Sequence, residues 1–404
     1  MASSEKTVLV IASYDKGHDF LRSCKAQGWR VVLITSESLR HSHQFPTDVI
    51  DELFFMRDVD KKWNLDETKR AVSYLARTRN FDRIVPLDDF DLETAALLRE
   101  HLRIPGMGET TTRYFRDKLA MRVRAQSTGI NVPDFVHLLN EDRIREFTSR
   151  VPAPWVVKPR SSAGAIGIKK AHSHEELWQI IEKLGDERSE FLLERYVAGD
   201  VFHVDSLVHE GKVLFVRASR YGRPPLDVSH QGDVFTSRIL PTGTSDSQAL
   251  IEMNAQVLTA MRLVRGASHT EFIRGRDDGL LYFLETSARV GGAHLADMLE
   301  AATGLNPWAE WAKIELAGEN GSYTAPPTRD EYAGILVSLS RQEHPDSTAF
   351  ADPEVVWRLN KAFHIGMIVR SPSPARIDEL LARYLEEIRR DFHAVAPPLT
   401  HANN

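Results

Sequence analysis

The sequence predicts the α/β fold class, with a parallel α/β domain at the N-terminus followed by α+β lobes. Strand and helix patterns alternate from residue 7 to residue 102, which is typical of a parallel sheet covered by helices. Hairpin signals follow at Gly211-Lys212 and at Asp277-Asp278-Gly279, where a glycine can adopt a positive φ between two apolar runs. A charged amphipathic helix is expected over 375–393.

Length, charge and cysteine usage limit the classes of function. A chain of 404 residues suggests about two or three domains. The net charge is −6 and no long basic run is present, so we expect a small-molecule substrate and no nucleic-acid partner. Cys24 is the only cysteine, which excludes an internal disulfide or a cysteine zinc site and suits the reducing cytosol. The apolar run 8–12 is too short for a signal peptide or membrane span, so we expect a soluble cytoplasmic protein.

The N-terminal domain is expected to contain four strands and three helices. The strands are 7–13, 29–35, 51–56 and 81–87, and the helices are 17–27, 65–79 and 91–102. The first turn reads SYDKGHD and lacks G-x-G-x-x-G, so no dinucleotide-binding fingerprint is present where that fold would need one.

The next segment carries two lysines in distinctive settings. Pro105-Gly106 ends the alternation, and a helix over 110–128 is expected to carry Asp117-Lys118. Lys158 lies within the apolar strand 155–159, where burying a lysine is costly unless an anion meets it. The small residues 161–167 that follow can fold over phosphates and offer backbone N–H groups, although their spacing is not that of a Walker A loop.

The second half of the chain alternates between strands and helices around one long irregular segment. Strands are expected at 191–196, 201–208, 213–219, 333–338 and 362–369, and helices at 247–263, 293–303 and 307–317. The segment 220–235, RYGRPPLDVSHQGDVF, is rich in Pro, Gly and Arg, and irregular segments of that length within compact domains are often functional lids.

A hairpin formed by 269–274 and 280–286 carries the strongest chemical signal. If Arg276 faces Leu280, Glu271 lies opposite Glu285, and two like charges across a buried ladder need a counter-charge. Mg²⁺ is the simplest one, because it prefers one or two carboxylates together with substrate phosphates. The alternative is an ordinary hairpin with partly solvated glutamates. Arg289 follows four residues after Glu285, and Gly291-Gly292 let the backbone approach an anion.

Taken in order, these motifs resemble the ATP-grasp superfamily of carboxylate–amine ligases, and within it the amino-acid ligases. The resemblance implies a pre-ATP-grasp domain at 1–109, lobe A at 110–190, lobe B with the metal and phosphoryl site at 191–318, and a small C-terminal α+β lobe at 319–404. It also implies a homodimer formed through the N-terminal domain.

The resemblance assigns roles to individual residues. Lys118 and Lys158 would be the nucleotide lysines, and Glu194-Arg195-Tyr196-Val197 the hinge that holds adenine, with the acidic side chain near the ribose. The remaining nucleotide contacts would be Ser161, Ser162 and Gly164 of the phosphate loop and His203 on the following strand.

The metal and phosphoryl site follows from the same resemblance. Glu271 and Glu285 would bind Mg²⁺, with Mn²⁺ as the alternative, and Arg289 would hold the transferred phosphoryl group. The family's Glu-x-Asn-x-Arg reads Glu285-Thr286-Ser287-Ala288-Arg289 here, so Ser287 replaces the third metal ligand.

The implied activity is ATP-dependent amide formation. A carboxylate would be activated as an acyl phosphate and attacked by an amine, giving ADP and phosphate. Substrate contacts are expected from His230, Gly291, Gly292 and His294. One alternative is a biotin-dependent carboxylase component that uses hydrogencarbonate, which the short phosphate loop and the lack of a following biotinyl domain disfavour. The other is a non-catalytic ATP-binding regulatory protein, which would have no need of both metal ligands and the phosphoryl arginine.

Overall fold

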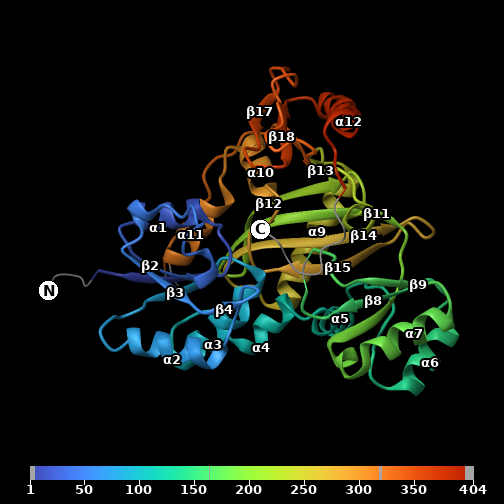
Figure 1. The fold of residues 1–404 in the computed structure, drawn as a ribbon, viewed down its shortest axis with the longest axis horizontal. Coiled ribbons are helices and arrows are strands. Elements are labelled where there is room, and N and C mark those ends of the chain that lie inside the picture. The colour runs from blue at the N-terminus through green and yellow to red at the C-terminus, as the bar shows by residue number, and fades with distance from the viewer. Residues whose placement is uncertain (1–4, 163, 318–320, 396–404) are drawn as a thin grey trace.

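The N-terminal part of the chain is a parallel sheet covered by helices. The computed structural model describes residues 5–162, 164–317 and 321–395 (Figure 1). The sheet has the order β3-β2-β1-β6, and every pairing in it is parallel, which confirms the predicted class. Its strands are β1 Thr7–Ala12, β2 Arg30–Ser36, β3 Glu52–Met56 and β6 Arg83–Pro86, and its helices are α1 His18–Ala26, α2 Leu65–Leu75 and α3 Leu92–Leu102. A short hairpin, β4 Asp58–Val59 and β5 Lys62–Trp63, follows β3.

The single helix expected over 110–128 is instead two helices. α4 covers Glu109–Thr112 and α5 covers Lys118–Ser127. The break falls at Asp117, whose side chain accepts hydrogen bonds from the backbone N–H groups of Leu119 and Ala120 and so caps α5. Lys118 therefore lies in the first turn of a new helix.

A small antiparallel sheet follows, with the order β7-β10-β8-β9. Its strands are β7 Phe135–His137, β8 Trp155–Pro159, β9 Lys169–Ala171 and β10 Phe191–Arg195. The helices α6 Glu141–Arg150 and α7 His174–Leu184 pack on it through a core that includes Ile144, Trp155 and Leu177 (Figure 1). β10 falls in the predicted lobe B by residue number but pairs with β7 and β8 of the predicted lobe A.

The rest of the chain forms one eight-stranded antiparallel sheet, with the order β15-β14-β11-β12-β13-β16-β18-β17. Its strands are β11 Gly199–His209, β12 Lys212–Tyr221, β13 Phe235–Ile239, β14 Gly266–Gly275, β15 Leu281–Ser287, β16 Tyr332–Leu339, β17 Val355–Arg358 and β18 His364–Ser371. Its helices are α9 Ser245–Met261, α10 Leu295–Thr303, α11 Pro307–Ala317 and α12 Pro374–Asp391. The C-terminal strands thus continue the sheet that carries the hairpin, and the four-part division of the chain stays a prediction.

The other parts of the molecule surround this large sheet. In Figure 1 the parallel domain lies to the left, the small sheet to the lower right and α12 at the top. α11 packs on α1 of the parallel domain, where the Phe20 and Trp311 ring centroids are 5.1 Å apart. Among the described residues, no helix combines the length and apolar character that crossing a membrane requires.

The segment 220–235 is not wholly irregular, because it contains the short helix α8 Pro225–Gln231. Proline at the first helical position has its φ preset for the helix. Asp233 ties this segment to α12, since its carboxylate lies 2.6 Å from Arg223 Nη1 and 2.8 Å from Arg389 Nη2. The segment is therefore held between the large sheet and the C-terminal helix.

Candidate active site

The hairpin of β14 and β15 brings the two predicted metal-binding glutamates together. Glu271 pairs with Glu285 as the sequence predicts, but the register near the turn differs from the expected one. Arg274 pairs with Leu281, which is one residue away from the register that a turn with Arg276 opposite Leu280 would set. A bulge between Glu271 and Phe272 then shifts the ladder by one residue and restores the expected pairing of the glutamates. The pairing therefore depends on a bulge that the hairpin signal did not contain.

Protein groups already lie beside both carboxylates. Lys118 Nζ is 2.7 Å from Glu285 Oε2, and the Tyr221 hydroxyl donates to Glu271 Oε1 at 2.8 Å. Burial would raise the pKa of Glu271, but the neighbouring His269 and Tyr221 lower it below its ordinary value. Two carboxylates on adjacent strands are a donor set that fits a hard divalent cation.

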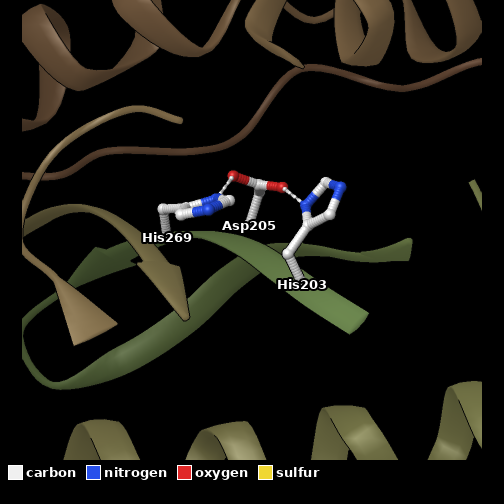
Figure 2. A group of neighbouring side chains, drawn as sticks. All are labelled: His203, Asp205 and His269. Atoms are coloured by element: carbon white, nitrogen blue, oxygen red, sulfur yellow. Dashed lines mark hydrogen bonds and ion pairs between the residues drawn. The ribbon is translucent and has the colours of Figure 1, made fainter. Parts of the chain in front are cut away.

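A buried hydrogen-bond network lies beside Glu271, whose Oε1 is 3.7 Å from His269 Nε2. Figure 2 shows three members of this network, His203 and Asp205 on β11 and His269 on β14. Asp205 lies between two histidines, with Oδ2 2.7 Å from His203 Nδ1 and Oδ1 2.8 Å from His269 Nδ1. His203 Nε2 lies 2.7 Å from Ser237 Oγ, so both of its ring nitrogens are engaged within the protein. His203 is completely buried, and the nucleotide contact that the resemblance implies for it stays a prediction.

The ionisation of this network follows from its burial and its charges. Burial lowers the pKa of His203, and it would also lower that of His269, but the Asp205 carboxylate raises the pKa of His269 to about 9. Burial would raise the pKa of Asp205, but the two histidines hold it well below its usual range. His203, Asp205 and His269 each place a potential metal-ligating atom within 4.8 Å of the others. The Nδ1 atoms of both histidines, however, are already hydrogen-bonded to Asp205.

Gly291 packs directly against this network, and we expect Gly291→Ala to be destabilising. An added Cβ would lie 2.9 Å from Asp205 Oδ1 and 3.0 Å from His269 Nδ1. Overpacking of this kind costs about 1–3 kcal/mol. Gly292→Ala is the matched control, because its Cβ would meet no atom of the described residues within 4 Å. Urea unfolding of both variants measures the difference, and equal midpoints would contradict this packing.

The predicted phosphoryl arginine reaches across to the parallel domain. Arg289 Nε and Nη2 lie 2.8 and 2.5 Å from Asp89 Oδ2, in a pair whose side chains are 15% and 5% exposed. Burial would lower the pKa of Arg289, but Asp89 and Asp88 raise it, so the guanidinium is firmly charged. Asp89 was not predicted as a site residue. Its signal was the acidic run after β6, since side chains at the carboxyl ends of parallel strands often form ligand sites.

Ser287, the expected third metal ligand, is the last residue of β15, two residues before Arg289. Burial would raise the pKa of Asp89, but Arg289, together with Arg116 and the Ser287 hydroxyl, lowers it below its ordinary value. The role of Ser287 as a metal ligand stays a prediction.

Asp91 of the same acidic run should make stability depend on pH. Its carboxylate accepts a hydrogen bond from the Ser13 backbone at 3.1 Å, and burial together with Asp88 raises its pKa to about 8. Because this pKa is above the unfolded value, the stabilisation is complete below about pH 4 and is lost as the pH rises towards 8.

We therefore expect Asp91→Asn to be more stable than the wild type at pH 9, by at least about 1 kcal/mol. The variant should also show a flatter dependence of unfolding free energy on pH between about 5 and 9. Urea unfolding across this range tests the expectation, with Glu93→Gln on the exposed face of α3 as the control. If Asp91→Asn leaves the slope of unfolding free energy against pH unchanged, Asp91 is not the group whose raised pKa causes the pH dependence.

The predicted nucleotide residues meet at the junction of α5 and the small sheet. Lys118 Nζ donates to the Ser162 carbonyl at 2.6 Å, which joins it to the loop at 161–167. Lys158 Nζ lies 2.5 Å from Glu194 Oε2. Glu194 was expected near the ribose, but its side chain is fully buried and also contacts Arg122, a residue that no sequence motif indicated.

The predicted phosphate loop contains glycines at positive φ, and the predicted hinge residues are held by side-chain contacts. Gly164 and Gly167 have φ of 68° and 74°, a region that favours glycine, and Ser161 and Gly164 are exposed. Ala163 lies outside the described residues. The Tyr196 ring lies under Lys170, whose Nζ is 4.0 Å from the ring centroid, and Val197 packs against the core beside β11 and β15.

The predicted substrate residues lie on different elements. His294 has φ of 60° and precedes α10, which begins at Leu295 rather than at the expected residue 293. Its Nδ1 lies 2.9 Å from Asp297 Oδ2, and its ring lies 4.7 Å from that of Trp357 on β17. His230 is exposed near the end of α8. The C-terminal strands therefore contribute an aromatic residue to the region after Gly292.

Comparison with known proteins shows which domain family and which solved fold this chain resembles. Residues 151–297 match the ATP-grasp domain family. The L-amino acid ligase from Bacillus licheniformis has the same fold, with a TM-score of 0.76, 17% identity and coverage of 98% of this chain and 99% of that one. The chain thus contains an ATP-grasp domain within an ATP-grasp fold, which confirms the resemblance and the predicted fold class.

Two curated relatives are named as amino-acid ligases. The L-arginine-specific L-amino acid ligase of Bacillus subtilis is 28% identical over 264 residues, which cover 64% of this chain and 63% of that protein. The match thus spans less than two thirds of that relative's length. The D-alanine–D-alanine ligase A of Bacillus cereus is 23% identical over 251 residues, covering 56% of this chain and 80% of that protein.

Proposed function

We propose that this protein is an ATP-dependent carboxylate–amine ligase that activates a carboxylic acid as an acyl phosphate and forms an amide, with an amino acid as one substrate. The pairing of Glu271 with Glu285, beside Lys118, carries this proposal. The names of the curated relatives support an amino acid as substrate. A homodimer formed through the N-terminal domain and a cytoplasmic location are part of the same proposal.

The residues of the site suit the charge changes of this reaction. Glu271 and Glu285 would hold Mg²⁺, with Mn²⁺ as the alternative, and the cation would neutralise phosphate oxygens of ATP. Lys118 and Lys158 would add positive charge on the nucleotide side. Arg289 presents a planar guanidinium that can hold a phosphoryl group through two N–H donors.

The substrates would be held beside Arg289 by backbone and by the segment 220–235. Gly291 and Gly292 would let the acyl group approach the backbone, since neither glycine carries a Cβ. The segment 220–235, which is tied to α12, would cover the acid and the amine. His230 and His294 are the proposed polar contacts to those substrates.

Phosphate release from ATP and Mg²⁺ by the purified protein tests this function. Single and paired amino acids and small carboxylic acids are the substrates to screen, with mass spectrometry of the product. Release that requires both an acid and an amine, with formation of the matching amide, is the expected result. Release that requires hydrogencarbonate and biotin would replace the proposal with a carboxylase. Nucleotide binding without release under any pairing would favour a regulatory binding protein.

A further inference from the structure

Arg122 on α5 is a buried cation with unused donors. Its side chain has no solvent exposure, and its Nε donates to Glu194 Oε1 at 2.6 Å. Within the part of the chain that the structure describes, Nη1 and Nη2 find no hydrogen-bond partner. The guanidinium carbon lies 5.7 Å from the centroid of Phe283. Buried guanidinium groups remain charged, so this arrangement is costly and calls for a functional reason.

Glu194 has two cations for one carboxylate. Arg122 contacts Oε1, and Lys158 Nζ lies 2.5 Å from Oε2. Burial would raise the pKa of Glu194, but Arg122 and then Lys158 lower it below its ordinary value. The three side chains therefore carry a net positive charge where one pair would have been neutral.

The two cations differ in how accessible they are to a ligand. Both contacts are short, with Arg122 Nε 2.6 Å from Oε1 and Lys158 Nζ 2.5 Å from Oε2 of Glu194. The Lys158 side chain is 15% exposed, while those of Arg122 and Glu194 are not exposed at all. Lys158 is thus the partner that can exchange Glu194 for a ligand.

We propose that Arg122 is a positioning residue that neutralises Glu194 and so releases Lys158 to bind the nucleotide. This inference rests on the proposed function, in which Lys158 contacts ATP. Without Arg122, movement of Lys158 towards a phosphate would leave a buried carboxylate uncompensated, and the cost of that charge would reduce nucleotide affinity. With Arg122 present, Glu194 keeps a counter-charge whether or not Lys158 is engaged.

Calorimetric binding of the β,γ-imido analogue of ATP with Mg²⁺ tests the inference without any amino-acid substrate. Arg122→Met keeps the apolar stem of the side chain and removes its charge. We expect it to weaken nucleotide binding about tenfold or more. Arg124→Met is the matched control on the same helix, because Arg124 donates instead to the Ala260 carbonyl. Its affinity should stay within about twofold of the wild type.

The double variant Arg122→Met/Glu194→Gln separates positioning from a purely structural role. Removing the carboxylate removes the reason to retain Lys158, so the double variant should bind within about threefold of Glu194→Gln alone. Unchanged affinity in Arg122→Met overturns the inference, and so does a tenfold loss in the double variant relative to Glu194→Gln, about 1.4 kcal/mol. If Arg122→Met does not fold, the double variant decides alone, since it contains no buried unpaired carboxylate.

Failure of this inference can be told apart from failure of the proposed function. A wild-type protein that binds no nucleotide would contradict the proposed ligase itself. A wild-type protein that binds nucleotide, together with an Arg122→Met protein that binds it equally well, would contradict only the role of Arg122.

Discussion

Glu285→Gln should fold like the wild type and lose amide-forming turnover by about a thousandfold or more, because a bound metal supplies several kcal/mol of charge stabilisation during phosphoryl transfer. The substitution preserves the shape of the side chain and removes the charge opposite Glu271. It also removes the ion pair with Lys118, whose Nζ lies 2.7 Å from the carboxylate. Turnover is measured as phosphate release with the substrate pair identified for the wild type.

The control for this variant lies on the same hairpin. Asp277→Asn changes an exposed carboxylate in the turn and should leave turnover within about twofold of the wild type. Circular dichroism and urea unfolding establish that Glu285→Gln is folded. Undiminished phosphate release by a folded Glu285→Gln protein would show that this carboxylate does not hold the metal.

Local pattern predicted the elements of the site well, because each depends on a few neighbouring residues. The apolar run of β8 placed Lys158 on a strand, and the bounds predicted for α11 are those observed. The pairing of Glu271 with Glu285 was predicted from a tight turn, although the observed register reaches it through a bulge. Helix periodicity alone predicted one helix over 110–128, whereas the structure has two. The second helix, α5, begins where the Asp117 side chain caps it.

The partners of the site residues could not be predicted from local pattern. Asp89 and Arg289 are 200 residues apart, and Arg122 and Glu194 are 72 apart, so only the packing of separate elements brings each pair together. The role of His203 depends in the same way on Ser237 of another strand. The spacing of charged residues in the sequence indicates which side chains could bind a nucleotide. Only the tertiary contacts show which of these side chains already bind another side chain of the protein.

Arg289→Met should lose turnover by about a thousandfold while retaining nucleotide binding, because preorganised charge at the transferred phosphoryl group acts chiefly on the reaction step. It should also lower the unfolding free energy by about 3 kcal/mol, since Asp89 would be left buried without its cation. Arg274→Met is the matched control. Arg274 on β14 pairs with Asp246 at 2.8 Å, but both side chains are substantially exposed, so a change of about 1 kcal/mol or less is expected.

Adding Asp89→Asn to Arg289→Met separates the two effects of the arginine. The double variant has no unpaired buried charge at this position, so most of the lost stability should return. Turnover should not return, because the guanidinium that would hold the phosphoryl group is still missing. Recovery of both would mean that Arg289 serves only to join the parallel domain to the large sheet, and recovery of neither would mean that Asp89 is not the group that Arg289 stabilises. Recovery of stability alone would assign Asp89 the role of holding the guanidinium in position for the phosphoryl group.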